Sequence, residues 1–129
     1  MLTLVNMMTV GKVEEGLAEL DQALARSTLS GENWADAELH RLRGDLMCQL
    51  PRPDLDSAER SLRTAVSIAR EQGTKGFELR AATSLARLLG GRGRREEARE
   101  SVAPVYDWFT EGFDTADLKD AKALLAELA

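Results

Sequence analysis

The sequence predicts an all-α fold, a single domain spanning residues 1–129 in which antiparallel helix pairs stack into a solenoid. Its composition favours helix, because only 10 Gly and 3 Pro accompany abundant Ala, Leu, Glu and Arg. No stretch alternates between apolar and polar residues with the period of two that a half-buried strand needs. Apolar residues instead recur at steps of three and four, and the pattern returns after about 40 residues, which is typical of helical repeats.

The clearest helix lies between Pro53 and Gly73. Asp54 is a suitable N-cap and Gly73 a suitable stop, so we expect the helix to run to about Gln72. Its other face is charged. Its apolar residues form one stripe: Leu55, Ala58, Leu62, Ala65, Val66 and Ala69.

The residues before this helix predict three more. We expect a short apolar helix over residues 1–10, ended by Gly11, and a long helix over residues 12–29. A turn rich in Ser, Gly and Asn follows. The next helix is expected over residues 34–50, with Trp34 as its first inward-facing apolar residue and a Pro-Arg-Pro segment as its end.

The C-terminal half predicts three helices, over residues 77–89, 94–110 and 115–129. Glycines lie at the ends of the first two and indicate turns there. Pro104 lies inside the second helix and predicts a kink, because proline removes one backbone hydrogen bond. The helix over residues 115–129 is expected to cap the array.

The repeat is seen when Gly16, Ala58 and Ala98 are overlaid, since they lie 42 and 40 residues apart. Small residues at these positions allow two helices to approach closely. Larger apolar residues then coincide one turn later, at Leu20, Leu62 and Val102. This register predicts about three helix pairs in a right-handed array, with a surface too apolar for any pair to be stable alone.

The step from Ala86 to Ala98, within the segment 85–105, resembles a tetratricopeptide repeat, in which a small residue on each helix marks the crossing. Gly44 and Ala58 match these positions in the preceding unit. The resemblance implies a tetratricopeptide-like α-α superhelix. Each unit is longer than the standard 34 residues, as in the extended repeats of bacterial signalling ATPases.

Three further segments resemble the C-terminal repeat region of large bacterial adenylate/guanylate cyclase–ATPase regulators: residues 11–16, 37–44 and 106–115. The cyclase and ATPase domains of such proteins do not fit in 129 residues, and there is no GxxxxGK[ST] phosphate-binding loop. The resemblance therefore implies a non-catalytic regulatory or scaffold segment. Either a fragment of such a regulator or a short reading frame derived from its gene is consistent with it.

Similarity to tetratricopeptide repeats implies a concave groove lined by the first helix of each pair. The residues expected to face it carry both signs of charge: Glu38, Arg41, Asp45 and Gln49 in one unit, and Arg80, Thr83 and Arg87 in the next. A peptide segment with both charges, or a polar helix of another protein, would suit such a groove. Any solvated helix face shows the same composition, so the pattern by itself leaves both interpretations open.

Two alternative functions remain open. The apolar residues Leu2, Leu4, Val5 and Met8 either pack on the next helix or join two copies of the chain, because the first end of the array lacks a polar cap. The turn that carries Arg92, Arg94 and Arg95 either connects two helices or binds an anion or nucleotide before a helix N-terminus.

Four aromatic residues lie close together near the C-terminus: Tyr106, Trp108, Phe109 and Phe113. On a helix, Tyr106, Phe109 and Phe113 share one face and Trp108 points elsewhere. They form either a hydrophobic lock against the capping helix or a docking surface with Trp108 exposed.

The composition argues against several other classes of function. A net charge of −5 disfavours non-specific binding of nucleic acid. Cys48 and His40 are the only residues of their types, so a disulfide or a typical zinc site is not expected, and Ser57, Ser61 and Ser67 have no nearby histidine as a base. We expect no enzyme activity, metal or cofactor. Without an apolar run of about 20 residues or a signal peptide, we expect no membrane association and a cytoplasmic location.

Overall fold

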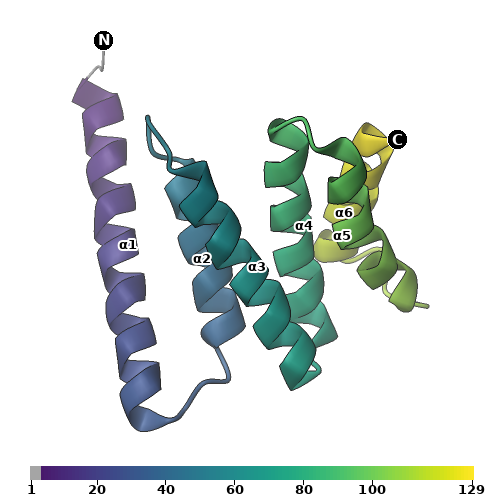
Figure 1. Cartoon of the computed structure of the whole chain (residues 1–129), viewed down its shortest axis with the longest axis horizontal. Coiled ribbons are helices and arrows are strands. Elements are labelled where there is room, and N and C mark those ends of the chain that lie inside the picture. The colour runs from purple at the N-terminus through teal and green to yellow at the C-terminus, as the bar shows by residue number, and fades with distance from the viewer. Residues whose placement is uncertain (1–3) are drawn as a thin grey trace.

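The computed structural model describes the backbone of residues 4–129 and the side chains of residues 10–129. This part of the chain is all helical and contains no strand, which confirms the predicted fold class at that level (Figure 1). Its helices are α1 (Leu4–Ser30), α2 (Asp36–Cys48), α3 (Leu55–Gln72), α4 (Lys75–Gly91), α5 (Arg95–Trp108) and α6 (Ala116–Leu128).

The predicted break at Gly11 is wrong, because α1 runs through this residue as one helix of 27 residues. A glycine inside a helix costs only about 1 kcal/mol relative to alanine, so it does not end a helix whose neighbours continue the hydrogen bonding. The helix instead ends before Gly31, which adopts a left-handed φ of 76°.

The ends of α3 form as predicted. Asp54 is its N-cap, and the Asp54 Oδ1 atom accepts a hydrogen bond of 3.0 Å from the backbone N–H of Ser57. At the other end Gly73 has φ 71° and its N–H returns to the carbonyl oxygen of Arg70.

Two local predictions need correction. Trp34 lies in the turn before α2 instead of inside the helix, and 71% of its surface is exposed. The helix α2 starts at Asp36, where Ala37 takes the buried position that was expected of the tryptophan. The helix α5 runs through Pro104 but ends at Trp108, two residues before the predicted end, and Phe109 is extended.

Consecutive helices pack against one another from α1 to α6, and neighbours run in opposite directions through α5 (Figure 1). Two contacts skip a helix in sequence: α2 touches α4, and α4 touches α6. These contacts place α2, α4 and α6 along one side of the described chain. At the other end, α1 touches only α2 within the part of the chain that the structure describes.

The main hydrophobic core lies between α3 and α6, and α1 and α2 contribute no residue to it. Its largest fully buried side chains are Leu62, Leu79, Leu89 and Val102. The helix α6 closes this core with Leu118, Ala121, Leu124 and Leu128. The helix α6 therefore packs against both α4 and α5.

Most of the small residues of the repeat pattern and of the tetratricopeptide resemblance are buried, whereas Gly16 is half-buried. Ala58, Ala86 and Ala98 are completely buried. At Gly44, a Cβ atom would lie only 2.7 Å from the Leu62 Cγ atom and 3.2 Å from the carbonyl oxygen of Ala58. These distances are shorter than van der Waals contact, so the α2–α3 crossing needs glycine at this position.

Candidate functional site

The predicted groove residues gather on neighbouring faces of α2 and α4. Five of the seven line one cavity of about 250 Å³, and Glu38 and Gln49 lie outside its lining. Three residues that sequence reasoning missed complete the lining: Ser84 on α4, and Asp117 and Asp120 on α6. The five predicted residues are Arg41, Asp45, Arg80, Thr83 and Arg87.

Ion pairs hold this groove together across three helices. On α2, Arg41 contacts Glu38 at 3.0 Å and Asp45 at 2.9 Å. From α4, Arg80 reaches Glu38 at 3.3 Å and Asp117 of α6 at 2.8 Å. Burial opposes the ionisation of Glu38, but hydrogen bonds and charge from Arg41 and Arg80 outweigh it and hold its pKa below the ordinary value. Ion pairs therefore fix the side chains of Glu38, Arg41, Asp45, Arg80 and Asp117 in advance of any binding.

A second cavity of about 460 Å³ adjoins the first, and both are lined by Asp45, Ser84 and Arg87. It is more apolar, with Leu55 and Leu88 among its lining residues, and it includes the predicted groove residue Gln49. On this face Arg41 and Arg80 pair with three carboxylates, those of Glu38, Asp45 and Asp117. Arg87, in contrast, makes no ion pair among residues 10–129. Arg87 therefore lies between a polar and a more apolar cavity, and its guanidinium group can pair with an acidic group of a ligand.

Cys48 also lines the second cavity. Burial raises the pKa of its thiol, and the nearby carboxylate of Asp45 raises it further. A thiol with a raised pKa is a weak nucleophile, so the position of Cys48 favours a packing role over a reactive one.

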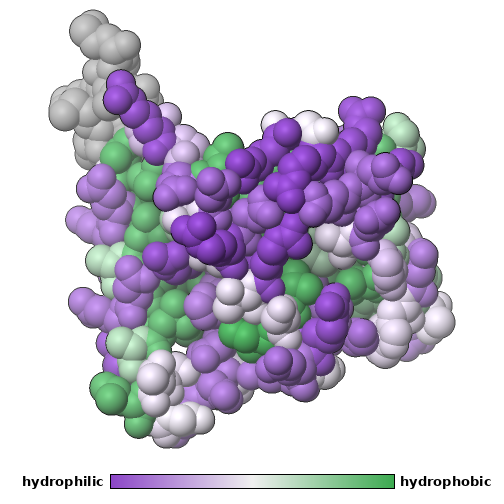
Figure 2. Space-filling view, in the orientation of Figure 1, coloured by the Kyte–Doolittle hydropathy of each residue, from purple (hydrophilic) through white to green (hydrophobic). Residues whose placement is uncertain are grey.

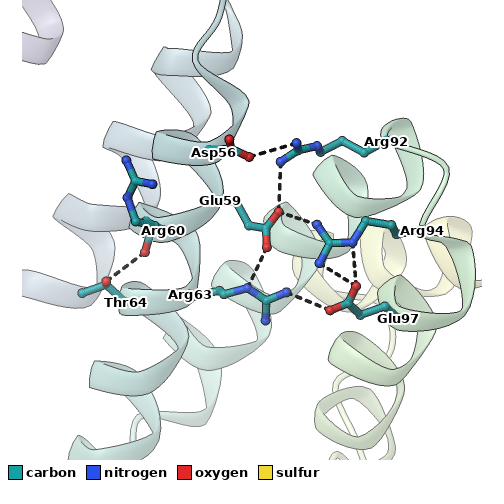
Figure 3. Close-up of polar contacts among 8 residues, drawn as sticks. All are labelled: Asp56, Glu59, Arg60, Arg63, Thr64, Arg92, Arg94 and Glu97. Atoms are coloured by element: carbon teal, nitrogen blue, oxygen red, sulfur yellow. Dashed lines mark hydrogen bonds and ion pairs between the residues drawn. The ribbon is translucent and has the colours of Figure 1, made fainter.

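Two of the three arginines predicted to bind an anion, Arg92 and Arg94, lie in a network of ion pairs between α3 and the connection from α4 to α5 (Figure 3). The carboxylate of Glu59 accepts hydrogen bonds from Arg94 at 2.7 Å, Arg63 at 2.9 Å and Arg92 at 3.1 Å. Arg92 also contacts Asp56 at 2.9 Å. Three arginines meet three carboxylates, since Arg94 and Arg63 contact Glu97 as well. The equal number of positive and negative groups favours a structural role for this network, in which it joins α3 to the connection between α4 and α5.

Arg95 lies apart from this network, on the lining of an open cavity with Glu96, Glu97 and Glu100. Carboxylates therefore surround the third predicted anion ligand, and they would repel an anion there. The structure does not bring Arg92, Arg94 and Arg95 together around one empty site.

Replacing Glu59 by glutamine is expected to lower the midpoint of thermal unfolding at pH 7 by about 5 °C, because three arginines lose their shared carboxylate. Burial opposes ionisation of Glu59, but hydrogen bonds from Arg63 and Arg94 hold its pKa below the ordinary value of 4.5. Its stabilisation is therefore fully present above pH 4.5 and is lost as the pH falls through the lower pKa of the folded state.

The measurement is thermal unfolding from pH 7 down to the acid transition, for the wild type and for E59Q. The difference between them should shrink below pH 4.5. The matched control is E71Q, because Glu71 lies on the same helix, is exposed and makes no ion pair with a described residue. A constant difference at all pH values would contradict a role for the Glu59 charge.

The residues predicted for self-association fall largely outside what the structure describes. Leu2 lies outside the described residues, and Leu4, Val5 and Met8 lie in α1 but their side chains are not among those described. The exposed residues of the rest of α1 include Lys12, Glu14, Glu15, Glu19 and Asp21.

The aromatic residues near the C-terminus do not share one helix face, because α5 ends at Trp108 and Phe109 and Phe113 follow it. Tyr106 and Phe109 pack against the hydrophobic core, and Tyr106 lies 5.9 Å from Phe113 between ring centroids. Trp108 is 57% exposed, its ring centroid lies 5.2 Å from that of Phe109, and Lys75 Nζ lies 5.6 Å from its ring. Tyr106 and Phe109 thus contribute to the packing of the core, whereas Trp108 and Phe113 are largely on the surface.

No group of three or more His, Cys, Asp or Glu residues in the described part of the chain is placed to hold a metal ion. None of the described helices has the length and hydropathy needed to cross a membrane.

Fold and groove together define a class: an all-helical protein of packed neighbouring helices with a charged groove on one side. Comparison with family models, with curated proteins and with solved structures found no match for this chain.

Proposed function

We propose that this protein is a non-catalytic interaction module that binds a segment of another protein along α2, α4 and α6. The observation that carries the proposal is the position of Arg87, between a polar cavity of about 250 Å³ and a more apolar one of about 460 Å³. A partner segment would place an acidic side chain on Arg87 and an apolar side chain beside Leu55 and Leu88. The surrounding ion pairs would set its register.

The proposal includes a tetratricopeptide-like arrangement, with α2 and α3 as one helix pair, α4 and α5 as the next, and α6 as the cover. Two observations support it. The first helices of the pairs, α2 and α4, contact each other. Small residues at the crossings are buried, namely Gly44, Ala58, Ala86 and Ala98.

We also propose that the interaction is regulatory, in a bacterial cytoplasmic signalling protein. The support is the resemblance of residues 11–16, 37–44 and 106–115 to the repeat region of cyclase–ATPase regulators. In this proposal the chain supplies a preformed surface and carries out no chemistry of its own.

Replacing Arg87 by glutamate is expected to weaken partner binding at least about tenfold, because it reverses the one available charge between the two cavities. The experiment captures partners from an extract of the source cells on immobilised wild-type protein, identifies them by mass, and measures the purified partner by calorimetry. The matched control is Arg99→Glu, since Arg99 is exposed on α5 and lines none of the cavities described here.

Equal affinity of the two variants for the purified partner would overturn the proposed groove. A partner that binds wild type and R99E alike but loses affinity for R87E would support it. Circular dichroism should show the same helix content for all three proteins, because neither side chain is part of the core.

The two alternative functions remain predictions. Self-association through Leu4, Val5 and Met8 concerns side chains that the structure does not describe. Anion sensing at Arg92 and Arg94 would require both guanidinium groups to leave the carboxylate of Glu59.

A further inference from the structure

A second groove lies on the side formed by α3, α4 and α5, away from α2 and α6. Its volume is about 520 Å³. The helices α3 and α5 form its walls and do not contact each other along their described backbones, and α4 forms the floor with Glu78 and Leu85. The groove therefore follows from the spacing of two parallel helices over a third.

An ion pair closes one end of this groove, where Arg63 of α3 contacts Glu97 of α5 at 3.1 Å, as part of the network in Figure 3. At the opposite end lie Arg70, Lys75 and Trp108. There Lys75 Nζ lies 5.6 Å from the ring of Trp108. From Arg63 to Arg70 the helix rises about 10 Å, which is the length of roughly three extended residues.

The end of the groove with Arg70 and Lys75 carries more positive than negative charge. The carboxylate of Glu78 lies in the floor, where only 3% of its side chain is exposed, between Arg70 Nε at 3.3 Å and Lys75 Nζ at 3.1 Å. Two cations thus share one carboxylate. The Arg70 side chain is 64% exposed, and its two Nη atoms donate to no described residue. This local excess of positive charge contrasts with the net charge of −5 of the whole chain.

Apolar side chains line the rest of the groove. Val66 lies on α3, Leu85 on α4, and Pro104, Val105 and Trp108 on α5. Figure 2 views this side of the molecule and shows hydrophobic green surface between α3 and α5, below a band of hydrophilic residues. Trp108 is an exposed aromatic residue beside this surface, a residue type that is enriched where proteins bind one another.

We propose that this groove is a second docking site, for an extended segment of a partner protein in which apolar residues precede an acidic side chain. The acidic side chain binds the free Nη atoms of Arg70, with Lys75 beside it. The apolar residues lie over Val66 and Val105, and Trp108 covers them. Near the closed end, Glu100 makes no ion pair with a described residue, so a basic residue three positions from the acidic one fits the charges of the groove.

The probe is the peptide acetyl-Lys-Leu-Leu-Asp-amide, and the matched probe is acetyl-Lys-Leu-Leu-Asn-amide. Binding is measured by the fluorescence of Trp108 in a Trp34→Phe background, because Trp34 is the only other tryptophan and lies in the turn before α2. We expect saturable binding of the aspartate peptide at submillimolar concentration. The asparagine peptide should bind about tenfold more weakly, because it lacks the charge that Arg70 recognises.

Two variants test the location of the site. Arg70→Gln removes the cation and should weaken binding of the aspartate peptide about tenfold, whereas it should leave the asparagine peptide nearly unaffected. Ser67→Tyr places a bulky side chain in the groove from α3 while keeping Arg70, Lys75 and Glu78, and it should abolish binding of both peptides. Arg99→Glu is the control for a general charge effect and should bind like the wild type.

No saturable response at millimolar peptide would overturn the proposal. Equal binding of the two peptides, or unchanged binding by both R70Q and S67Y, would also overturn it. The test is independent of the groove along α2, α4 and α6, because Trp108 lines only the groove between α3 and α5 among the cavities described here.

Discussion

Replacing Gly44 by valine is expected to destabilise the protein by about 3 kcal/mol, which would lower the midpoint of thermal unfolding by about 10 °C. A Cβ atom at this position lies 2.7 and 2.8 Å from two atoms of Leu62, whose side chain is fully buried. It also lies 3.2 Å from the carbonyl oxygen of Ala58, which cannot rotate away. The clash therefore forces α2 and α3 apart and opens the packing around Leu62.

The measurement is denaturant and thermal unfolding of G44V, with Gly76→Ala as the control. Gly76 lies in the first turn of α4, and no described atom is within 4 Å of the position its Cβ would take. G76A should therefore be as stable as the wild type or more stable by up to about 1 kcal/mol, because alanine favours helix. Equal stability of G44V and the wild type would show that α2 and α3 do not need close approach.

The pattern of Gly44 and Ala58 illustrates what the sequence predicts well. A small residue every 40 residues or so, followed by larger apolar residues one turn later, has one physical cause, which is close approach of two helices. That cause acts within a pair of neighbouring helices, so the pattern is visible without knowledge of the rest of the fold. The bounds of α3 were predictable for the same reason, because Asp54 and Gly73 act locally.

Gly11 and Trp34 show where local reasoning fails. Glycine often follows the last residue of a helix, so Gly11 predicts a helix end. The helix α1 nevertheless continues through Gly11, because it is one helix that packs against α2. Trp34 fits an apolar pattern, yet the turn before α2 leaves it on the surface. Whether the helix continues at Gly11 and whether Trp34 is buried both depend on contacts between segments of the chain. A pattern of residue types along the sequence does not contain these contacts.

The candidate grooves were predictable only in part, for a related reason. Helical periodicity places Arg41 and Asp45 on one face of α2, and Arg80 and Arg87 on one face of α4. It does not show that Asp117 of α6 joins them, because the last helix was expected to serve only as a cap. Aligning the first turn of α6 with the first helix of a third pair would have found Asp117. The groove between α3 and α5 depends on the distance between helices, for which the sequence carries no signal.

Removing α6, by ending the chain after Thr115, is expected to abolish cooperative folding. The helix buries Leu118, Leu124 and Leu128 against α4 and α5, with between 3% and 6% of each side chain exposed. Burial of three leucines contributes about 6 kcal/mol, which is comparable with the whole stability of a typical domain. The truncated chain would also expose the partners of these leucines in the core, so we expect aggregation and loss of the unfolding transition.

The matched truncation removes α1 by starting the chain at residue 32. Within the described residues α1 contributes only Val13 and Ser27 to the buried set, and it touches only α2. It also makes two polar side-chain contacts with α2, from Asp21 to Arg43 at 3.0 Å and from Ser27 to Asp36 at 2.6 Å. We expect this chain to keep a cooperative transition with a loss of about 2–3 kcal/mol.

The two truncations together test whether the C-terminal helix α6 contributes more to the stability of the protein than the N-terminal helix α1. Each removes one terminal helix of the described array, so loss of helix length alone predicts a larger effect for α1, which has 27 residues against 13 in α6. Burial predicts the opposite order, because the main core lies between α3 and α6. Circular dichroism during heating distinguishes them: a cooperative transition without α6 and none without α1 would show that the stability of this chain does not reside in that core.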